Sequence, residues 1–213
     1  MCKRTVIDPA VAVRAVSAYN RGRYRGRLNV DIDRDGYERF RSGLASGMSA
    51  LVEQLRFVGE EYGGAQARFI SHDYREEAAL MATKLAPALG ELSALINDLP
   101  PLDTAVPSPE VLTRLFAPFA ATKRWGVWAS KTLHFLGRPH SQSSTRVQRP
   151  RSLDSSAPDY HRFCLCFQEA IRDNALALTA ARAVDNGTSP SDLKLFDKIL
   201  YETGSEVIGG AAA

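Results

Sequence analysis

The chain has 213 residues, of which 45% are hydrophobic and 24% charged, and its formal net charge is +3. No long apolar run follows the basic N-terminus, and none approaches the roughly 18 residues of a membrane span, so we expect neither a signal peptide nor a membrane partner. The three cysteines are an odd number, which argues against a disulfide framework and favours the cytoplasm.

Helix signals dominate the chain from its first residues onward. Asp8-Pro9 and Ser108-Pro109 each predict an N-cap followed by a proline at the first helical position. Apolar residues at helical spacing follow both starts, and no repeats or convincing strand pairs are present. The predicted helices cover 10–20, 37–41, 49–62, 74–97 with a kink or break at Pro87, 111–120 perturbed by Pro118, 127–136, 159–184, and a last stretch that starts at 189–192 and ends at 201.

The connecting segments suggest one domain. Residues 99–108 hold three prolines and read as a linker, and residues 138–158 form a long polar, basic loop. We therefore predict an all-α fold: a compact multi-helix domain with a helix-hairpin-helix-like element. It spans residues 1–204, with a division into two lobes near 99–108 left open, and 205–213 are a flexible tail.

Charge is unevenly distributed along the chain. Residues 1–41 hold ten Lys and Arg against five Asp and Glu, and residues 123–162 hold eight against two. Residues 42–122 and 163–213 are acidic, with five basic against ten acidic residues and four against seven. Two basic segments that include aromatic residues can converge on one face, where they suit a polyanion. Solvated charge on unrelated surfaces is the alternative.

The first segment with candidate binding residues is Tyr19–Arg27, in which arginines alternate with glycines and tyrosines. Glycines let a backbone approach closely, arginines hold phosphates, and tyrosine and asparagine can stack on or read a base. A solvated basic turn between helices is the alternative. The predicted base-binding residues are Tyr19, Asn20 and Tyr24, and the predicted backbone contacts here are Arg21, Arg23 and Arg27.

The second segment, Lys123–Pro139, combines a tight turn around Gly126 with a helix that carries Lys131. It resembles the helix-hairpin-helix of the DNA glycosylase superfamily, in which backbone N–H groups of the hairpin grip a phosphate. Family hairpins commonly have Pro-Gly-Val-Gly-x-Lys-Thr-Ala. This chain keeps Gly126, Val127, Lys131 and Thr132, but has Trp128 in place of the second glycine and one extra residue before the lysine.

Residues 130–136 are also similar to the Ser-Lys-x-Leu-His-Phe-Leu stretch of some bacterial glycosylase-like proteins, so the resemblance covers about 30 of the 213 residues. It implies DNA-backbone contacts in this segment. A helix with Leu133 and Leu136 in the core and Lys131 merely exposed is the alternative. The implied backbone residues are Lys123, Arg124, Gly126, Ser130 and Thr132.

The resemblance also implies a catalytic carboxylate, because positive charge develops on the sugar as the glycosidic bond breaks. In the superfamily an aspartate follows the hairpin by about twenty residues, and Asp154 lies 23 residues after Lys131. Closer relatives have a shorter gap, which would land near 143–144, where this chain has no carboxylate. Asp159 is a second choice, and Asp33 could replace the missing aspartate. Lys131 could act as a Schiff-base nucleophile.

Metal sites are not indicated. The run from Asp31 to Gly36 resembles the start of a calcium loop, but Ser42 stands where the final glutamate belongs. Its carboxylates are expected to pair with neighbouring arginines, or one of them to face the base. The histidines and cysteines have no established zinc spacing. We expect no metal and no cofactor.

Three hypotheses about function follow. The first is a DNA glycosylase-like enzyme that flips out a base and cleaves its N-glycosidic bond, acting on damaged bases or on modified bases of invading phage DNA. The second is a non-catalytic DNA- or RNA-binding helical module. The third is a helical interaction protein whose basic patches meet an acidic partner. The sequence does not indicate the base or the oligomeric state.

Overall fold

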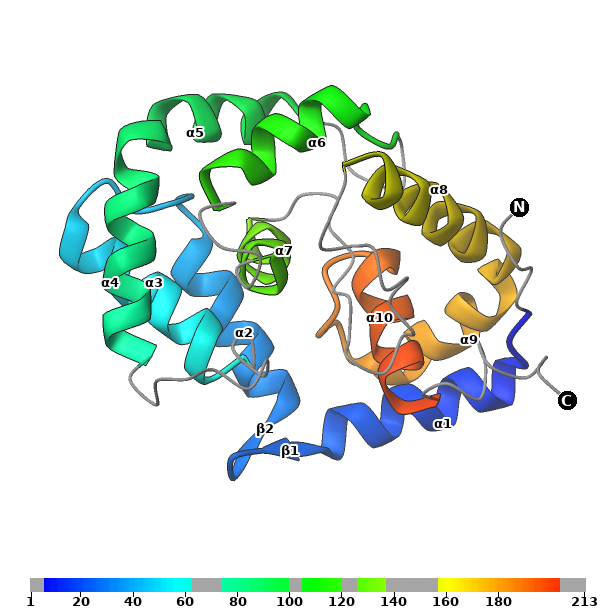
Figure 1. Ribbon diagram of the computed structural model, residues 1–213. Coiled ribbons are helices and arrows are strands. Elements are labelled where there is room, and N and C mark those ends of the chain that lie inside the picture. The colour runs from blue at the N-terminus through cyan, green and yellow to red at the C-terminus, as the bar shows by residue number, and fades with distance from the viewer. Residues whose placement is uncertain (1–5, 63–73, 100–104, 120–125, 137–156, 204–213) are drawn as a thin grey trace, which may run out of the picture.

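The computed structural model describes residues 6–62, 74–99, 105–119, 126–136 and 157–203. These parts of the chain are mostly helical, which confirms the all-α fold class (Figure 1). The elements are α1 (Pro9–Arg21), β1 (Arg23–Tyr24), β2 (Arg27–Leu28), α2 (Asn29–Phe40), α3 (Met48–Glu60), α4 (Tyr74–Leu85), the 3-10 turn η1 (Ala86–Ala88), α5 (Leu89–Asp98), α6 (Pro109–Phe116), the 3-10 turn η2 (Ala117–Phe119), α7 (Gly126–Phe135), α8 (Ala157–Asp173), α9 (Ala175–Asp185) and α10 (Asp192–Thr203).

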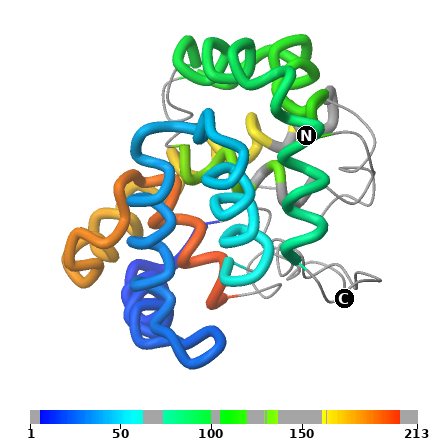
Figure 2. The backbone as a smooth tube through the Cα atoms, turned by 90° about the vertical axis from the view of Figure 1, so that its left-hand side faces the viewer, coloured from blue at the N-terminus to red at the C-terminus, as the bar shows by residue number. Residues whose placement is uncertain are grey.

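The helices surround α7. On one side α1 packs along α9 and α10, and on the other α3 packs along α4. Between these groups α7 contacts α2 and α3, and Figure 1 shows it almost end-on near the centre. Figures 1 and 2 place α5 and α6 at the end opposite α1 and the hairpin, and α6 packs on α8. Helices distant in sequence therefore share one interior.

Two helix starts follow the predicted cap-and-proline pattern. The Asp8 side chain accepts hydrogen bonds from the backbone N–H groups of Ala10 (2.7 Å) and Val11 (3.3 Å), ahead of Pro9. The Ser108 hydroxyl likewise accepts from the N–H of Val111 at 3.4 Å. Each cap satisfies N–H groups that the helix itself leaves without partners.

The segment between α1 and α3 differs from the prediction. A two-stranded antiparallel hairpin, β1–β2, follows α1 directly, so the expectation of no paired strands is wrong. The next helix covers Asn29–Phe40 rather than 37–41. Strands of two residues are too short to produce an alternating pattern of apolar and polar residues. The helix α2 was predicted too short because charged residues outnumber the apolar ones on which helical periodicity is recognised.

Two breaks divide predicted helices. The stretch 74–97 is interrupted at Ala86–Ala88, around Pro87, as expected. The stretch 159–184 is not one helix, because Asn174 separates α8 from α9. The Asn174 side-chain oxygen accepts a hydrogen bond from the N–H of Ile7 at 2.6 Å, so the break holds the segment that leads into α1.

A close contact between α2 and α7 depends on a glycine. Gly36 faces the ring of Phe135, and a Cβ atom at this position would overlap that ring. Phe135 also stacks on Phe40 and meets Tyr62 with ring centroids 4.4 Å apart. α7 is therefore seated on α2 through a surface that accepts no side chain at residue 36.

One helical stretch among the described residues, Tyr74–Asp98, is long and apolar enough to cross a membrane, although the sequence was expected to contain none. Core helices of soluble proteins share this length and composition. Here Met81, Leu85 and Leu92 are buried against the rest of the protein. A single stretch of this kind is weak evidence for a membrane span.

Two cysteines lie on α8. Cys164 is a buried free thiol, and burial raises its pKa to about 12. The predicted division near 99–108 and the tail at 205–213 stay predictions, since these stretches lie wholly or partly outside the described residues.

Candidate functional site

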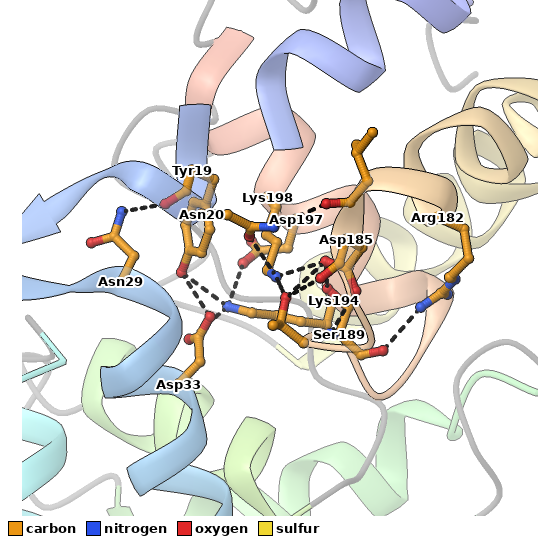
Figure 3. A network of polar contacts seen from close by, with 12 residues as sticks. Tyr19, Asn20, Asn29, Asp33, Arg182, Asp185, Ser189, Lys194, Asp197 and Lys198 are labelled. Atoms are coloured by element: carbon orange, nitrogen blue, oxygen red, sulfur yellow. Dashed lines mark hydrogen bonds and ion pairs between the residues drawn. The ribbon is translucent and has the colours of Figure 1, made fainter. Parts of the chain in front are cut away.

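The most unusual feature of the interior is a buried group of charged side chains around α10. Lys194 is fully buried, and Asp33 and Asp197 are 1% and 2% exposed. The Lys194 amine lies 2.9 Å from Asp33 Oδ1 and 3.7 Å from Asp197 Oδ2. Figure 3 shows the three side chains converging from α2 and α10. We call Asp33, Lys194 and Asp197 the Lys194 cluster.

Two tyrosines from other parts of the chain donate hydrogen bonds to Asp33 of the Lys194 cluster. Tyr19 of α1 donates to Asp33 Oδ2 at 3.1 Å, and Tyr62, two residues beyond α3, donates to Asp33 Oδ1 at 2.9 Å. Lys194 also lies within 3.3 Å and 2.9 Å of these two hydroxyls. Burial, reinforced by the charge of Asp33, raises the pKa of Tyr19 and of Tyr62 well above the ordinary value. Both phenols therefore stay neutral donors at physiological pH.

Asp197 is the least satisfied member. Its Oδ1 atom is buried and makes no hydrogen bond within the described part of the chain. Burial raises the pKa of Asp197 to about 6; Lys194 and Lys131 oppose this shift, and Asp33 adds to it. Buried groups with displaced pKa values and specific charge partners are concentrated at functional sites.

The second buried lysine of α10, Lys198, has a different environment, the Lys198 cluster. Its amine contacts Asp185 Oδ1 at 2.8 Å, Thr188 Oγ at 2.6 Å and Asn20 Oδ1 at 3.1 Å, so each of its three N–H groups has an acceptor. Asp185 also accepts from the Ser189 N–H and hydroxyl, each at 2.8 Å. Burial raises the pKa of Asp185, but the bonds from Lys198 and Ser189 outweigh it, and the net pKa is lowered.

Lys131 of α7 lies at the edge of the Lys194 cluster. It is half-buried, its amine donates to the backbone oxygen of Tyr62 at 2.8 Å, and it lies 5.3 Å from the centre of the Tyr62 ring. One turn further along α7, His134 Nε2 is 2.6 Å from the Tyr37 hydroxyl. Tyr62 thus joins Lys131, through its carbonyl, to Asp33, through its hydroxyl.

The predicted catalytic residues are partly brought together. Asp33 and Lys131 share Tyr62 as a neighbour, whereas Asp154 lies outside the described residues. Asp33 is the member of its acidic run that faces a buried lysine. Its neighbours in that run pair with arginines, as expected: Asp31 with Arg34 at 2.8 Å, and Asp35 with Arg27.

The predicted base-binding residues separate into two groups. Tyr19 is buried against Asp33. The Asn20 side chain accepts from Lys198 at 3.1 Å and donates to the carbonyl of Val184 at 3.5 Å, so both ends of its amide are engaged inside the protein. Tyr24, by contrast, lies in the hairpin and is only half-buried.

The predicted backbone contacts also differ in placement. Arg21 and Arg23 are exposed, whereas Arg27 pairs with both Asp35 and Glu61. Thr132 is fully buried, so its side chain is not on a surface that could meet DNA. Gly126 is the first residue of α7, and the side chain of Ser130 is not among those described. Lys123 and Arg124 lie outside the described residues.

Sequence reasoning missed both lysines of α10 and their partner Asp185. Lys194, Asp197 and Lys198 are spaced i, i+3 and i+4, which is the usual pattern of a solvent-exposed, salt-bridged helix face. In the structure every residue of α10 from Leu193 to Leu200 is buried. Only the packing of α1, α8 and α9 around α10, together with Asp33 of α2, distinguishes the two cases.

A search for metal sites among the described residues finds no group of three or more His, Cys, Asp or Glu side chains arranged to hold an ion. Comparisons with protein-family models, with curated proteins and with solved structures found no match to this chain.

Proposed function

We propose that the protein binds DNA and cleaves the N-glycosidic bond of a damaged or modified base. The observation that carries this proposal is the position of Tyr62 between Lys131 and Asp33. Lys131 belongs to the segment that resembles DNA glycosylases. Its amine donates to the backbone carbonyl of Tyr62, and the hydroxyl of the same tyrosine donates to Asp33, a buried carboxylate that the resemblance does not supply. One residue therefore links an amine to a carboxylate.

The two groups suit the steps of this reaction. When the C1′–N bond breaks, positive charge develops on the sugar, and a carboxylate held without water nearby stabilises that charge. A neutral amine can instead attack C1′ and expel the base, which leaves with the bonding electrons and takes up a proton. The nitrogen then loses a proton, and the C1′–O4′ bond breaks to give the Schiff base and a free 4′-hydroxyl. Lys131 and Asp33 are our candidates for these roles, and Asp154, implied by the resemblance, is the second candidate carboxylate.

DNA binding is supported by exposed arginines on the segment that joins α1 to α2. Arg21 and Arg23 are exposed, and this segment leads directly into the helices that carry Tyr19 and Asp33. Phosphates would be held there while a nucleotide leaves the stack. We place the protein in the cytoplasm, where damaged bases and modified phage DNA are both available.

One observation favours the alternative of a non-catalytic DNA- or RNA-binding module. Asp33 is 1% exposed and already accepts from Tyr19, Tyr62 and Lys194. A carboxylate in this state can be purely structural. A binding module retains the arginines and needs no accessible carboxylate, so cleavage must be measured directly.

The test incubates the protein with duplexes that each carry one damaged or modified base, and then cleaves abasic sites with alkali. We expect strand breaks for at least one base. Lys131→Gln should lower the single-turnover rate at least about 100-fold, while Lys84→Gln, at an exposed lysine of α4, leaves it unchanged. Borohydride should trap the wild type, but not Lys131→Gln, on DNA if the amine is the nucleophile.

The carboxylates are compared in parallel through Asp33→Asn and Asp154→Asn. Loss of cleavage in one of them, with DNA affinity retained, identifies the group that stabilises the sugar. If no duplex of the panel yields strand breaks, or if all three variants cleave as the wild type does, the enzyme proposal is wrong and the binding module is preferred.

A further inference from the structure

The hairpin between α1 and α2 has a tight, arginine-bearing tip. Arg23 pairs with Leu28 and Tyr24 with Arg27, which leaves Arg25 and Gly26 as a two-residue loop. Both loop residues have positive φ, 51° at Arg25 and 82° at Gly26. This is the geometry of a type I′ turn, in which Asn, Asp or Gly is favoured at the first position. Arginine adopts it at a cost, which directs attention to its side chain.

The base of the hairpin is fixed to Tyr19, whose hydroxyl bonds to Asp33 of the Lys194 cluster. The Asn29 side chain donates to the carbonyl of Tyr19 at 3.2 Å, and the Asn29 N–H donates to the carbonyl of Gly22 at 2.9 Å. A Cβ at Gly22 would lie 2.6 Å from Asn29 Nδ2, so this clamp also requires a residue without a side chain. The hairpin is therefore a rigid extension of the helices that carry Tyr19 and Asp33.

The arginines of the hairpin are not equivalent. Arg27 is held inward by Asp35 and Glu61, and Arg23 donates to the carbonyl of Gly26 at 2.7 Å, which braces the turn. Arg25 is exposed at the tip and makes no ion pair within 4.0 Å in the described part of the chain, although the charge of Glu60 acts on it from further away. Its guanidinium lies 5.7 Å from the ring centre of Tyr24 and 5.8 Å from that of Tyr74.

This arrangement places one exposed cation close to two aromatic rings. Two half-buried tyrosine rings, from β1 and from the start of α4, support one planar cation that is open to solvent. A guanidinium offers a flat face for stacking together with N–H donors for a phosphate. An acidic peptide would need only the charge, whereas an unpaired nucleobase beside its own phosphate uses both the plane and the charge.

We propose that Arg25, supported by Tyr24 and Tyr74, is a stacking platform for an unpaired base of a nucleic acid. The inference rests on the proposed function only in its choice of DNA as the partner. In this proposal the hairpin tip binds an unstacked base, and Arg27 holds the hairpin in place through Asp35 and Glu61. The cleavage chemistry at Lys131 has no part in it.

The test measures binding without turnover. Two short duplexes of the same sequence are used, one fully paired and one with a single extrahelical 2-aminopurine, at a series of KCl concentrations. All proteins carry Lys131→Gln, so that the proposed attack of Lys131 on the DNA does not interfere with the binding measurement. The Arg25→Ala and Arg25→Lys variants are compared with Arg114→Ala, which removes an exposed arginine of α6 at the opposite end of the molecule.

With Arg25 present, we expect tighter binding of the duplex with the unpaired base and quenching of its 2-aminopurine fluorescence. Arg25→Ala should weaken this binding by about 10-fold. Arg25→Lys should retain the affinity for the paired duplex and its salt dependence, but lose the preference and the quenching. Arg114→Ala should behave as the background protein. Matching thermal unfolding curves will show that each variant is folded.

The proposal is overturned if Arg25→Lys keeps the preference and the quenching, if Arg25→Ala binds both duplexes unchanged, or if no DNA is bound. Poly-glutamate that binds as tightly as DNA and tolerates Arg25→Lys would indicate an acidic protein partner instead. These outcomes are independent of strand cleavage. If Arg25 confers the preference for the unpaired base but the cleavage assay yields no strand breaks, this inference holds and the enzyme proposal is wrong.

Discussion

Lys194 and Lys198 lie one turn apart on the same helix, and both are fully buried, yet their surroundings differ in kind. Lys198 meets one carboxylate, and its remaining N–H groups are matched by Asn20 and Thr188. Lys194 meets two carboxylates, one of which has an oxygen without a hydrogen bond in the described structure. The first environment is complete, and the second holds more negative charge than its lysine neutralises.

This difference separates a structural ion pair from a candidate site. Burying a charge is tolerated when its partners satisfy it fully, as in the Lys198 cluster. An excess carboxylate in the interior raises the free energy of the folded state and adds nothing to packing. Such a group is more readily explained by a role in binding or chemistry, and the charge of Lys131 acts on it.

The largest expected effect is in the Lys198 cluster. Asp185→Asn leaves Lys198 without a negative partner in a buried place, and we expect it to lower the free energy of unfolding by about 3–5 kcal/mol. Urea unfolding measures this value. The double variant Asp185→Leu with Lys198→Met should recover part of the loss, because no uncompensated charge remains. A loss below about 1 kcal/mol for Asp185→Asn would contradict the assignment.

The next effect is a change in pH dependence at Asp197. Its pKa is about 6 in the folded protein against an ordinary 3.8, so the stability it contributes is complete below about pH 4 and is lost as the pH rises through 6. The unfolding free energy of Asp197→Asn minus that of wild type should therefore increase by about 2 kcal/mol between pH 4 and pH 6, and by about 3 kcal/mol over the whole titration. Asp192→Asn, at the exposed first residue of α10 where the side chain pairs with Arg182, is the control on the same helix.

The smallest effect is expected for Asp33→Asn. Asp197 remains beside Lys194, and the new amide keeps one oxygen as an acceptor for Tyr19 or Tyr62, so we expect a loss of about 2 kcal/mol. Unfolding under the conditions used for Asp185→Asn gives a direct comparison. If Asp33→Asn lowers the free energy of unfolding as much as Asp185→Asn does, Asp197 does not neutralise Lys194. The proposed difference between the two clusters is then wrong. A modest cost also keeps this variant usable in the cleavage assay.

Much of the helical framework could be predicted because it rests on local chemistry. The caps at Asp8 and Ser108 and the break around Pro87 act within a few residues, and all three occur as expected. The break at Asn174 could not be predicted, since its partner Ile7 lies 167 residues away. Patterns that extend over a few residues cannot predict a contact between residues so far apart in the sequence.

Only part of the candidate site could be predicted from the sequence. Lys131 was predicted from the resemblance, and Asp33 as a replacement for the aspartate that the resemblance implies; both stay predictions as catalytic residues, and the structure links them through Tyr62. The charges of α10 have the spacing of an exposed helix face, and nothing local distinguishes a buried Lys194 from a solvated one. The hairpin drew attention through its composition, while its strand pairing and the role of Arg27 became apparent only from distances.

The order of synthesis gives the buried lysines a further consequence. Tyr19 precedes Lys194 by 175 residues, and Asn20 precedes Lys198 by 178. On the ribosome, the first helices emerge with their carboxylate and phenols hydrated, because the cations that let them be buried have not yet been made. The interior cannot close until α10 has left the exit tunnel, so chains halted before Asp192 should remain open to proteases and chaperones. Two lysines thus make the synthesis of α10 a condition for closing the interior.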